Sequence, residues 1–435
     1  MRSARQFTVE NPKDFKQNLL HWSRQFQEVA WLDSNEYIQK HGEFDALLAV
    51  GAFTAIKTDY HNAFDKLQEY QETTKDWIFG YLSYDLKNDV EKLSSRNFDG
   101  LAFPDLYFFQ PQKLFLLKGE HLEMQYLRMV DDEMEDDLEE IKQGDPKNVQ
   151  QKMVEESPAG ASTIVARTSE QDYLKKVEQM LNHIQRGDIY EANFCQEFFS
   201  EKRVIDPFRI FEELNAISGP PFATFLRLEE HYLLSASPER YLKKTGSKLI
   251  SQPIKGTARR AEDPIEDAKI TENLKNDPKE RSENVMIVDL VRNDLSRIAK
   301  KGSVKVEELC RVYPFKQVHQ LISTISAELD ENIPPVEALR VTFPMGSMTG
   351  APKISAMKII EELEDAKRGL YSGAVGYFTP TGDFDFNVVI RSILYNSEKK
   401  YVSFSVGGAI TAQSIPEKEY EECLLKAKAM RQVLS

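Results

Sequence analysis

The sequence predicts an α+β protein with large antiparallel β-sheets and helices on their outer side. In the second part of the chain, helical and strand-like segments follow one another irregularly, without the strict strand and helix alternation of a parallel sheet. In the first part, short β-like runs such as WIFGYLSYDL and LYFFQPQKLFLL mix with amphipathic helical segments such as NAFDKLQEYQ. The chain has 435 residues, 41% of them hydrophobic, which is enough to bury real cores.

A boundary is predicted between about residues 130 and 165, where the chain reads VDDEMEDDLEEIKQGDPKNVQQKMVEESPAGAS. This stretch is first strongly acidic and then polar with Pro, Gly and Ser, as a solvated connection would be. We therefore expect an amino-terminal region, 1–160, that contributes strands and helices, and a second region, 165–435.

The second region begins with predicted elements that are easy to delimit. They are a helix over 171–188 and strands over 189–200, 221–228, 232–244 and 249–257. Lys255 lies in the last strand-like run, LISQPIKGT, between Ile254 and Gly256 and just before a turn and a basic pair. It is either an exposed strand lysine or a reactive group, and its immediate surroundings do not decide between the two.

Two pairs of glutamates recur at helical spacing. Glu280 and Glu283 are three apart on the first turns of a predicted helix, and Glu419 and Glu422 repeat this arrangement on the last helix of the chain. Acidic residues favour helix N-termini through the macrodipole, so either pair alone is weak evidence. Both pairs together could converge on Mg²⁺, which accepts one or two carboxylates, but spacing does not show convergence.

Other polar features have two readings each. Arg391 falls within the second strand of a predicted hairpin with its turn at TPTGD, and a buried arginine needs an anionic partner. His319 is either a hydrogen-bonded structural histidine or a catalytic one. The turn in FPMGSMTGAPKISAMKIIEEL and the paired glycines of VGGAITAQS suit an anionic ligand, but equally an ordinary cap and a tight turn.

Composition limits the class of partner. A net charge of −14 argues against a general binder of nucleic acid, so an anionic substrate would need a metal ion or a placed arginine. The first residues lack the apolar core of a signal peptide, and no run approaches the roughly 20 apolar residues of a membrane helix. Cys195, Cys310 and Cys423 are too far apart for a disulfide framework or a zinc spacing. We expect a cytoplasmic protein that binds neither nucleic acid nor membranes.

Seven segments, in this order, closely resemble the chorismate-utilising enzymes: SASPERYLKK, PIKGTARR, SENVMIVDLVRNDLSRI, FPMGSMTGAPKISAMKII, RGLYSGAVGYF, VVIRS and VGGAITAQSIPEKEYEE. The resemblance spans about 165 to 435, and WIFGYLSYDL and FPDLYFFQPQKLF extend it more loosely into the first region. It implies the fold of anthranilate synthase component I, in which large antiparallel sheets pack as a sandwich with helices outside. It also implies Mg²⁺ as cofactor and chorismate, a dianion, as substrate.

The resemblance assigns roles to individual residues. It implies that Glu283 and Glu422 bind the metal, with Glu280 and Glu419 as nearby or water-mediated partners. Glu239, in SPER, matches the general acid that protonates the departing 4-hydroxyl, a task for a carboxyl that is protonated near neutral pH. His319 and Ser347 match polar positions near the reacting ring and are implied to be catalytic. The positions implied to bind the substrate are Gly256, Thr257, Tyr371, Arg391, Gly407, Gly408 and Ala409.

Lys255 separates branches of the family. Anthranilate synthases typically have alanine in the matching PIAGT pattern, whereas a lysine marks the enzymes that make 4-amino-4-deoxychorismate. In that branch the lysine amine, which must be neutral to attack, is thought to bond to C2 before ammonia displaces it by attack at C4. Isochorismate and salicylate synthases carry a water-activating lysine where this chain has Glu191, so water addition is not expected and the role of Glu191 stays open.

The resemblance therefore predicts Mg²⁺-dependent amination of chorismate at C4, for para-aminobenzoate and folate synthesis. No segment resembles a glutamine amidotransferase, so ammonia from glutamine would come from a separate subunit. Some relatives hold tryptophan in the sheets of the first region, which these residues do not decide. Two alternatives are an anthranilate synthase component I and a non-catalytic chorismate-binding regulatory protein.

Overall fold

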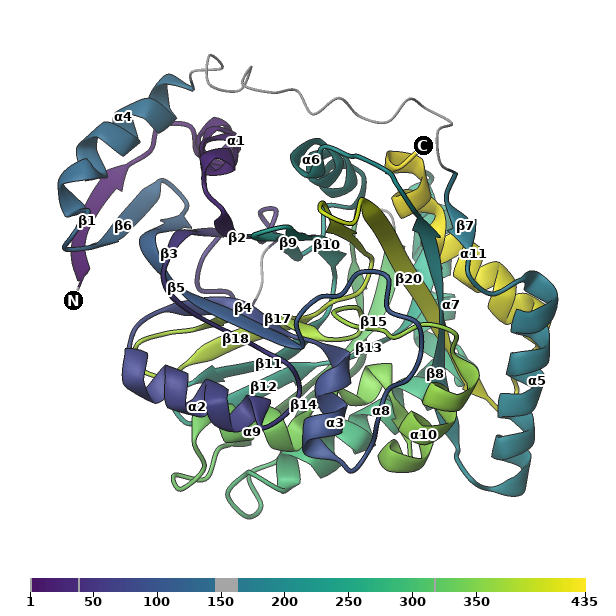
Figure 1. Cartoon of the computed structure of the whole chain (residues 1–435). Coiled ribbons are helices and arrows are strands. Elements are labelled where there is room, and N and C mark those ends of the chain that lie inside the picture. Colours follow the sequence, from purple (N-terminus) through teal and green to yellow (C-terminus); the bar gives the residue numbers. More distant parts are fainter. Residues whose placement is uncertain (1, 38–39, 145–162, 317) are drawn as a thin grey trace.

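The computed structural model describes residues 2–37, 40–144, 163–316 and 318–435. In these ranges twenty strands join one antiparallel sheet that folds back on itself, with eleven α-helices around it (Figure 1). The α+β prediction is thus confirmed. The sheet consists of two arms that share the long strand β5 (Leu106–Lys118), because β5 pairs with both β3 and β4.

The first arm runs from β5 across strands of both sequence regions. Its strands, in order of pairing, are β3 (Ala46–Thr58), β2 (Glu28–Asp33), β9 (Phe222–Leu228), β10 (His231–Ser237), β19 (Ser392–Asn396), β20 (Tyr401–Thr411) and β8 (Glu191–Ser200). Strand β8 also pairs with the short β7 (Val165–Ala166) and β16 (Gly350–Ala351). Beyond β5 lie β6 (His121–Leu127) and β1 (Arg2–Thr8).

The second arm carries most of the loops that concern the site. Its strands, again in order of pairing, are β4 (Ile78–Leu82), β17 (Ala374–Phe378), β18 (Phe384–Val388), β11 (Arg240–Thr245), β12 (Lys248–Gln252) and β15 (Val318–Glu328). Strand β15 pairs further with β13 (Ile254–Arg259) and β14 (Lys305–Pro314).

The two arms face each other across a common core, as alternation along the strands shows. On β10, Leu233 packs into a cluster with Leu242 and Phe386 of the second arm, whereas its neighbour Leu234 packs into a different cluster. The helices that join the common cluster are α2 (Ala63–Thr74), α8 (Pro278–Ser296) and α9 (Pro335–Thr342).

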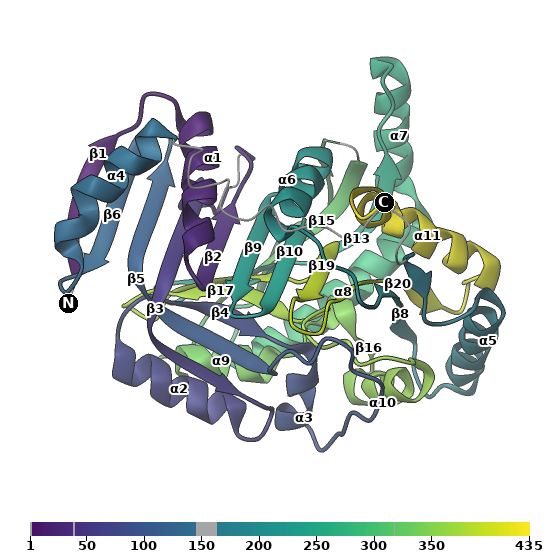
Figure 2. The same cartoon turned by 45° about the horizontal axis from the view of Figure 1, so that its top comes forward.

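Six helices join the other cluster, on the outer face of the first arm. They are α1 (Pro12–Trp22), α4 (Met134–Gln143), α5 (Glu170–Arg186), α6 (Pro207–Ser218), α10 (Lys353–Leu363) and α11 (Pro416–Val433). The remaining helices are the one-turn α3 (Lys87–Val90) and α7 (Pro264–Asn276), which projects from the body of the molecule in Figure 2.

The two sequence regions share the sheet. Strand β2 of the first region pairs with β9 of the second, and β4 pairs with β17. The predicted division between 1–160 and 165–435 falls on 145–162, which lie outside the described residues, so it stays a prediction. The acidic stretch before it was expected to be a solvated connection, and this is wrong: it forms α4, which buries Leu138 and Ile141 and exposes most of its acidic residues.

Two further expectations can be compared with the described residues. All three cysteines are free and buried. None of the helices in the described ranges has the length and apolar character needed to cross a membrane.

Candidate active site

Lys255 lies on β13 at a meeting point of several elements. It is partly buried, and the Asn284 side chain of α8 donates a hydrogen bond to its backbone oxygen at 3.3 Å. Its charge lowers the pKa of Glu191 on β8 and of Glu283 on α8, although burial raises both pKa values overall. It acts in the same way on Glu239. The three carboxyl groups that the charge of Lys255 affects therefore come from three separate segments of the chain.

Glu239 lies between β10 and β11 and is 4% exposed. Burial raises the pKa of its carboxyl to about 7, against the opposing effects of a hydrogen bond with Ser347 and the charge of Lys255. Ser347 is itself buried, in the 3₁₀ turn Gly346–Met348. A carboxyl with this pKa can give up a proton near neutral pH, which is what a general acid requires.

The structure brings the two glutamate pairs together. Lys279 Nζ lies 3.8 Å from Glu283 Oε1 on α8 and 3.8 Å from Glu419 Oε1 on α11, so the helices meet at this lysine. A Cβ atom on Gly408 would lie 3.4 Å from Glu419 Oε2 and 3.6 Å from Glu422 Oε1. The N-terminal turn of α11 therefore faces strand β20 near the glycines of the predicted site, and Lys279 links that turn to α8.

The electrostatics of these carboxylates suit a divalent cation. Burial raises the pKa of Glu280 and Glu419, and that of Glu283 to about 7. Burial also opposes ionisation of Glu422, but Lys426 Nζ at 2.6 Å lowers its pKa overall. Among the described residues, no three His, Cys, Asp or Glu side chains are already placed so that they could bind one metal ion together. Mg²⁺ needs only one or two carboxylates besides water and substrate, so these oxygens fit it.

Arg391 is a candidate positive charge for binding an anionic ligand. Its guanidinium makes no hydrogen bond or ion pair with any residue that the structure describes. Burial lowers the pKa of Arg391, and the charge of Glu239 opposes this shift. The prediction that it lies within a strand is wrong: it falls between β18 and β19, with φ at +51°. Arg391 is partly buried, and an unpaired guanidinium that is partly removed from water is destabilising unless a carboxylate or similar anion binds it.

The glycines Gly407 and Gly408, followed by Ala409, lie on β20 opposite β8. A Cβ atom on Gly407 would come within 2.5 Å of both Cys195 Sγ and the Phe194 oxygen, so only glycine fits there. Lys426 Nζ donates to the Gly407 oxygen at 2.7 Å.

The remaining predicted residues lie around β13 and β15. Gly256 has φ at +94°, and a Cβ atom there would lie 3.1 Å from Glu280 Oε2, whereas Thr257 is exposed. His319 on β15 is buried, its Nε2 is 2.8 Å from Asp267 Oδ1 on α7, and its Nδ1 has no hydrogen-bond partner among the described residues. A carboxylate thus orients one ring nitrogen of His319, while the other is buried without a partner among the described residues.

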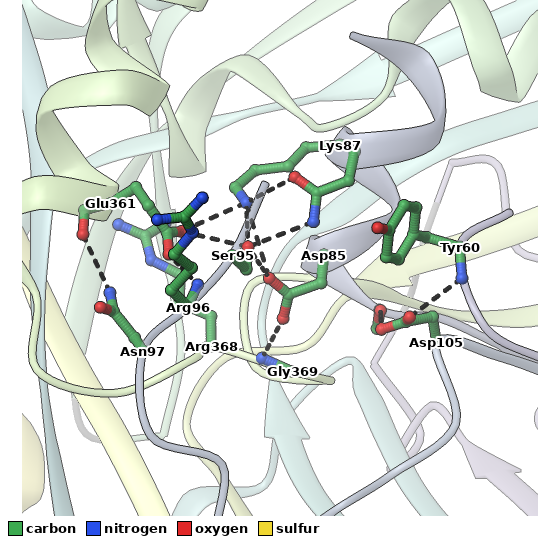
Figure 3. Close-up of polar contacts among 12 residues, drawn as sticks. Tyr60, Asp85, Lys87, Ser95, Arg96, Asn97, Asp105, Glu361, Arg368 and Gly369 are labelled. Carbon is green, nitrogen blue, oxygen red and sulfur yellow. Dashed lines mark hydrogen bonds and ion pairs between the residues drawn. The ribbon is translucent and has the colours of Figure 1, made fainter. Parts of the chain in front are cut away.

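Tyr371 is buried, and Cys195 Sγ lies 3.8 Å from its hydroxyl oxygen. Residues of the first sequence region contact the turn that precedes Tyr371. Asp85 Oδ2 accepts a hydrogen bond from the Gly369 N–H at 3.0 Å. Lys87, 1% exposed, lies 3.6 Å from Asp85 and 3.3 Å from Glu361 of α10 (Figure 3). A buried lysine with two carboxylates thereby ties the turn before Tyr371 to both α3 and α10.

Sequence reasoning missed several of these side chains. Lys426 follows Glu422 by four residues on one helix, a pair that spacing alone could have indicated. The spacing of Lys279 and Glu283 carries the same signal. The contacts of Lys279 with Glu419, of Asn284 with the backbone of Lys255, and of Lys87 with Glu361 carry none, because these partners are distant in sequence.

An α+β fold with clustered carboxylates and an arginine that no described residue pairs has the charges that an enzyme for an anionic small molecule needs. A sequence model described as chorismate binding enzyme matches residues 6–432, and the chain belongs to that family. The predicted family is thus confirmed.

Relatives of two kinds are similar to this chain. Aminodeoxychorismate synthase component 1 of Escherichia coli is 43% identical over 58% of this chain, and that of Bacillus subtilis is 31% identical over 91%. The chain covers 55% and 84% of these proteins, so it spans little more than half of the Escherichia coli relative. Anthranilate synthase component 1 of Thermus thermophilus is 35% identical, covering 81% of this chain and 76% of that protein.

Solved structures share the fold. Anthranilate synthase component I from Streptococcus pneumoniae has a TM-score of 0.75 at 24% identity, covering 91% of this chain and 95% of its own. The isochorismate synthase MenF from Escherichia coli has a TM-score of 0.75 at 17% identity, covering 100% and 94%. The predicted anthranilate synthase component I-like fold is confirmed.

Proposed function

We propose that this chain aminates chorismate at C4 to 4-amino-4-deoxychorismate, with Mg²⁺ and with ammonia from a separate glutamine amidotransferase subunit. One observation carries the proposal: Lys255, which the anthranilate synthase pattern replaces by alanine, lies near enough to the candidate acid Glu239 for its charge to affect the pKa of that carboxyl. Relatives named aminodeoxychorismate synthase component 1 support it, but an anthranilate synthase is about as similar, so similarity alone does not select the product.

Substrate binding follows from the charges of the site. Arg391, unpaired by any described residue, is suited to a carboxylate of chorismate. Glu283 and Glu422 would hold Mg²⁺, with Glu280 and Glu419 beside them. Bound there, the ion supplies positive charge that offsets these glutamates and a substrate carboxylate.

The bond changes assign separate tasks to two side chains. Glu239 donates its proton to the 4-hydroxyl, which leaves as water, while the neutral amine of Lys255 bonds to C2 and the two ring double bonds shift towards C4. Ammonia then bonds to C4, the double bonds shift back, and the lysine nitrogen leaves C2. Each step exchanges one bond to the ring for another, so no oxidant or reductant is required.

A product assay tests this assignment. Incubation with chorismate, Mg²⁺ and an ammonium salt should yield 4-amino-4-deoxychorismate, detected by chromatography against a standard. Lys255→Ala should lower this rate by at least about a hundredfold, because the covalent route is lost. Lys305→Ala, at an exposed lysine of β14, is the matched control and should keep the rate.

Other outcomes would select the alternatives. Anthranilate as the main product, with a rate that Lys255→Ala leaves unchanged, would favour an anthranilate synthase component I. Calorimetric binding of chorismate without turnover, even with a glutaminase subunit supplied, would favour a regulatory protein. Glutamine should support the reaction only when that subunit is present.

A further inference from the structure

Lys279 is a cation held between the two glutamate pairs. Its Nζ is 3.8 Å from Glu283 Oε1 on its own helix and 3.8 Å from Glu419 Oε1 on α11. The carboxylate side chains are 11% and 4% exposed, whereas 40% of the lysine side chain is exposed. The lysine therefore reaches from the rim of the site to two mostly buried anions that belong to different helices.

The contacts of Lys279 are looser than those of comparable lysines. Lys426 lies 2.6 Å from Glu422 and Lys353 lies 2.6 Å from Asp294, both within hydrogen-bonding distance. At 3.8 Å Lys279 hydrogen-bonds neither of its carboxylates.

Glu283 Oε1 is buried and accepts no hydrogen bond from any residue in the described ranges. A buried carboxylate oxygen without a hydrogen-bond donor is destabilising. Lys279 therefore offsets the negative charge of Glu283 but does not supply this hydrogen bond.

We propose that Lys279 substitutes for the metal ion: its ammonium group lies between Glu283 and Glu419 until Mg²⁺ binds to this group of glutamates, and then moves out. This inference rests on the Mg²⁺ site of the proposed function, though not on the identity of the product. A unit positive charge and a divalent ion only a few ångströms apart repel each other, so Lys279 and Mg²⁺ compete for the same group of carboxylates.

The exposure of Lys279 makes this exchange feasible. A long, flexible side chain with an exposed stem can turn its ammonium group into water, where it is well hydrated. Lys426 does not share this freedom, because it is bound to both Glu422 and the backbone oxygen of Gly407. Of these two lysines, Lys279 is thus the one whose side chain can move away from the glutamates.

Titration of the full chain with Mg²⁺ alone, by calorimetry at low ionic strength, tests the exchange. Lys279→Gln removes the competing charge and should bind Mg²⁺ about tenfold more tightly than the wild type, whereas Lys279→Arg should not. In the presence of a chelator, Lys279→Gln should unfold several degrees below the wild type, and saturating Mg²⁺ should remove most of that difference. Lys428→Gln, at an exposed lysine of α11, is the control and should match the wild type in both assays.

Equal or weaker Mg²⁺ binding by Lys279→Gln would overturn the proposal, because the lysine would then not compete with the ion. Absence of Mg²⁺ binding in all variants would overturn it together with the metal site. Tighter binding in Lys279→Gln, combined with a wild type that makes no 4-amino-4-deoxychorismate, would support this inference and refute the proposed function.

Discussion

Replacing Glu239 by Gln should change how stability depends on pH, because burial controls the ionisation of this carboxyl. Its pKa rises from an ordinary value of 4.5 to about 7 in the folded protein. Between these two values the folded state keeps a proton that the unfolded state has lost. The contribution of Glu239 to the free energy of unfolding therefore falls as pH rises through this window, and is constant above it.

The size of the effect follows from the shift. The two pKa values of Glu239 differ by about 2.5 units, and each unit corresponds to about 1.36 kcal/mol. Charging the buried carboxyl thus costs about 3 kcal/mol of unfolding free energy. Glutamine has nearly the same shape and does not ionise, so the variant avoids this loss. Relative to the wild type, Glu239→Gln should gain about 3 kcal/mol between about pH 4.5 and about pH 7.5.

Urea unfolding followed by tryptophan fluorescence, at several pH values across this range, measures the difference. Glu362→Gln, at an exposed glutamate of α10, is the control and should give a curve parallel to that of the wild type. If the unfolding free energy of Glu239→Gln also ran parallel to that of the wild type over this pH range, the reasoning would be refuted. The carboxyl of Glu239 would then have the same pKa in the folded and unfolded states.

The same pKa sets an expectation for catalysis. A general acid must be protonated, so kcat/KM of the wild type should fall as pH rises above about 7. Glu239→Gln should lower kcat by about a hundredfold or more. A wild-type profile that stays flat from neutral to alkaline pH would contradict the role of Glu239 as the acid.

Arg391→Met should raise the KM for chorismate about tenfold or more, as steady-state kinetics would measure, because the substrate carboxylate loses its cation. Urea unfolding should show no loss of unfolding free energy, because no described residue pairs with the guanidinium. Lys87→Met should lower the unfolding free energy by about 3 kcal/mol, since Asp85 and Glu361 lose a buried counter-charge, and Lys87→Arg should restore part of it. Asp267→Asn should lower kcat about tenfold with KM kept, because His319 loses the carboxylate that orients its ring; equal kinetics would contradict this.

Local patterns in the sequence were enough for the fold class and for the family. Alternating apolar residues delimited strands such as β8, and helical spacing put Glu280 and Glu283 on one face of α8. The motifs around Glu239 and Lys255 identified the family that the comparison confirms. Roles of single residues in binding and catalysis stay predictions.

What the sequence did not reveal depends on contacts between distant segments. Spacing could not show that α8 and α11 meet, because Lys279 and Glu419 come together only through the sheet beneath them. The apolar run VVIRSILY was taken as one strand, but β18 and β19 pair with different neighbours, β11 and β10. Arg391 therefore lies at the bend between them, with a left-handed backbone that no period of two predicts.

The mixed pairing of the sheet has a consequence for any attempt to shorten the chain. The motif-rich part alone, begun at residue 163, would lose β2 and β4, the partners of β9 and β17. Two strands in the middle of the sheet would then become edges with free backbone donors and acceptors, which recruit strands of other molecules. We expect such a fragment to aggregate, whereas the full chain covers these edges itself.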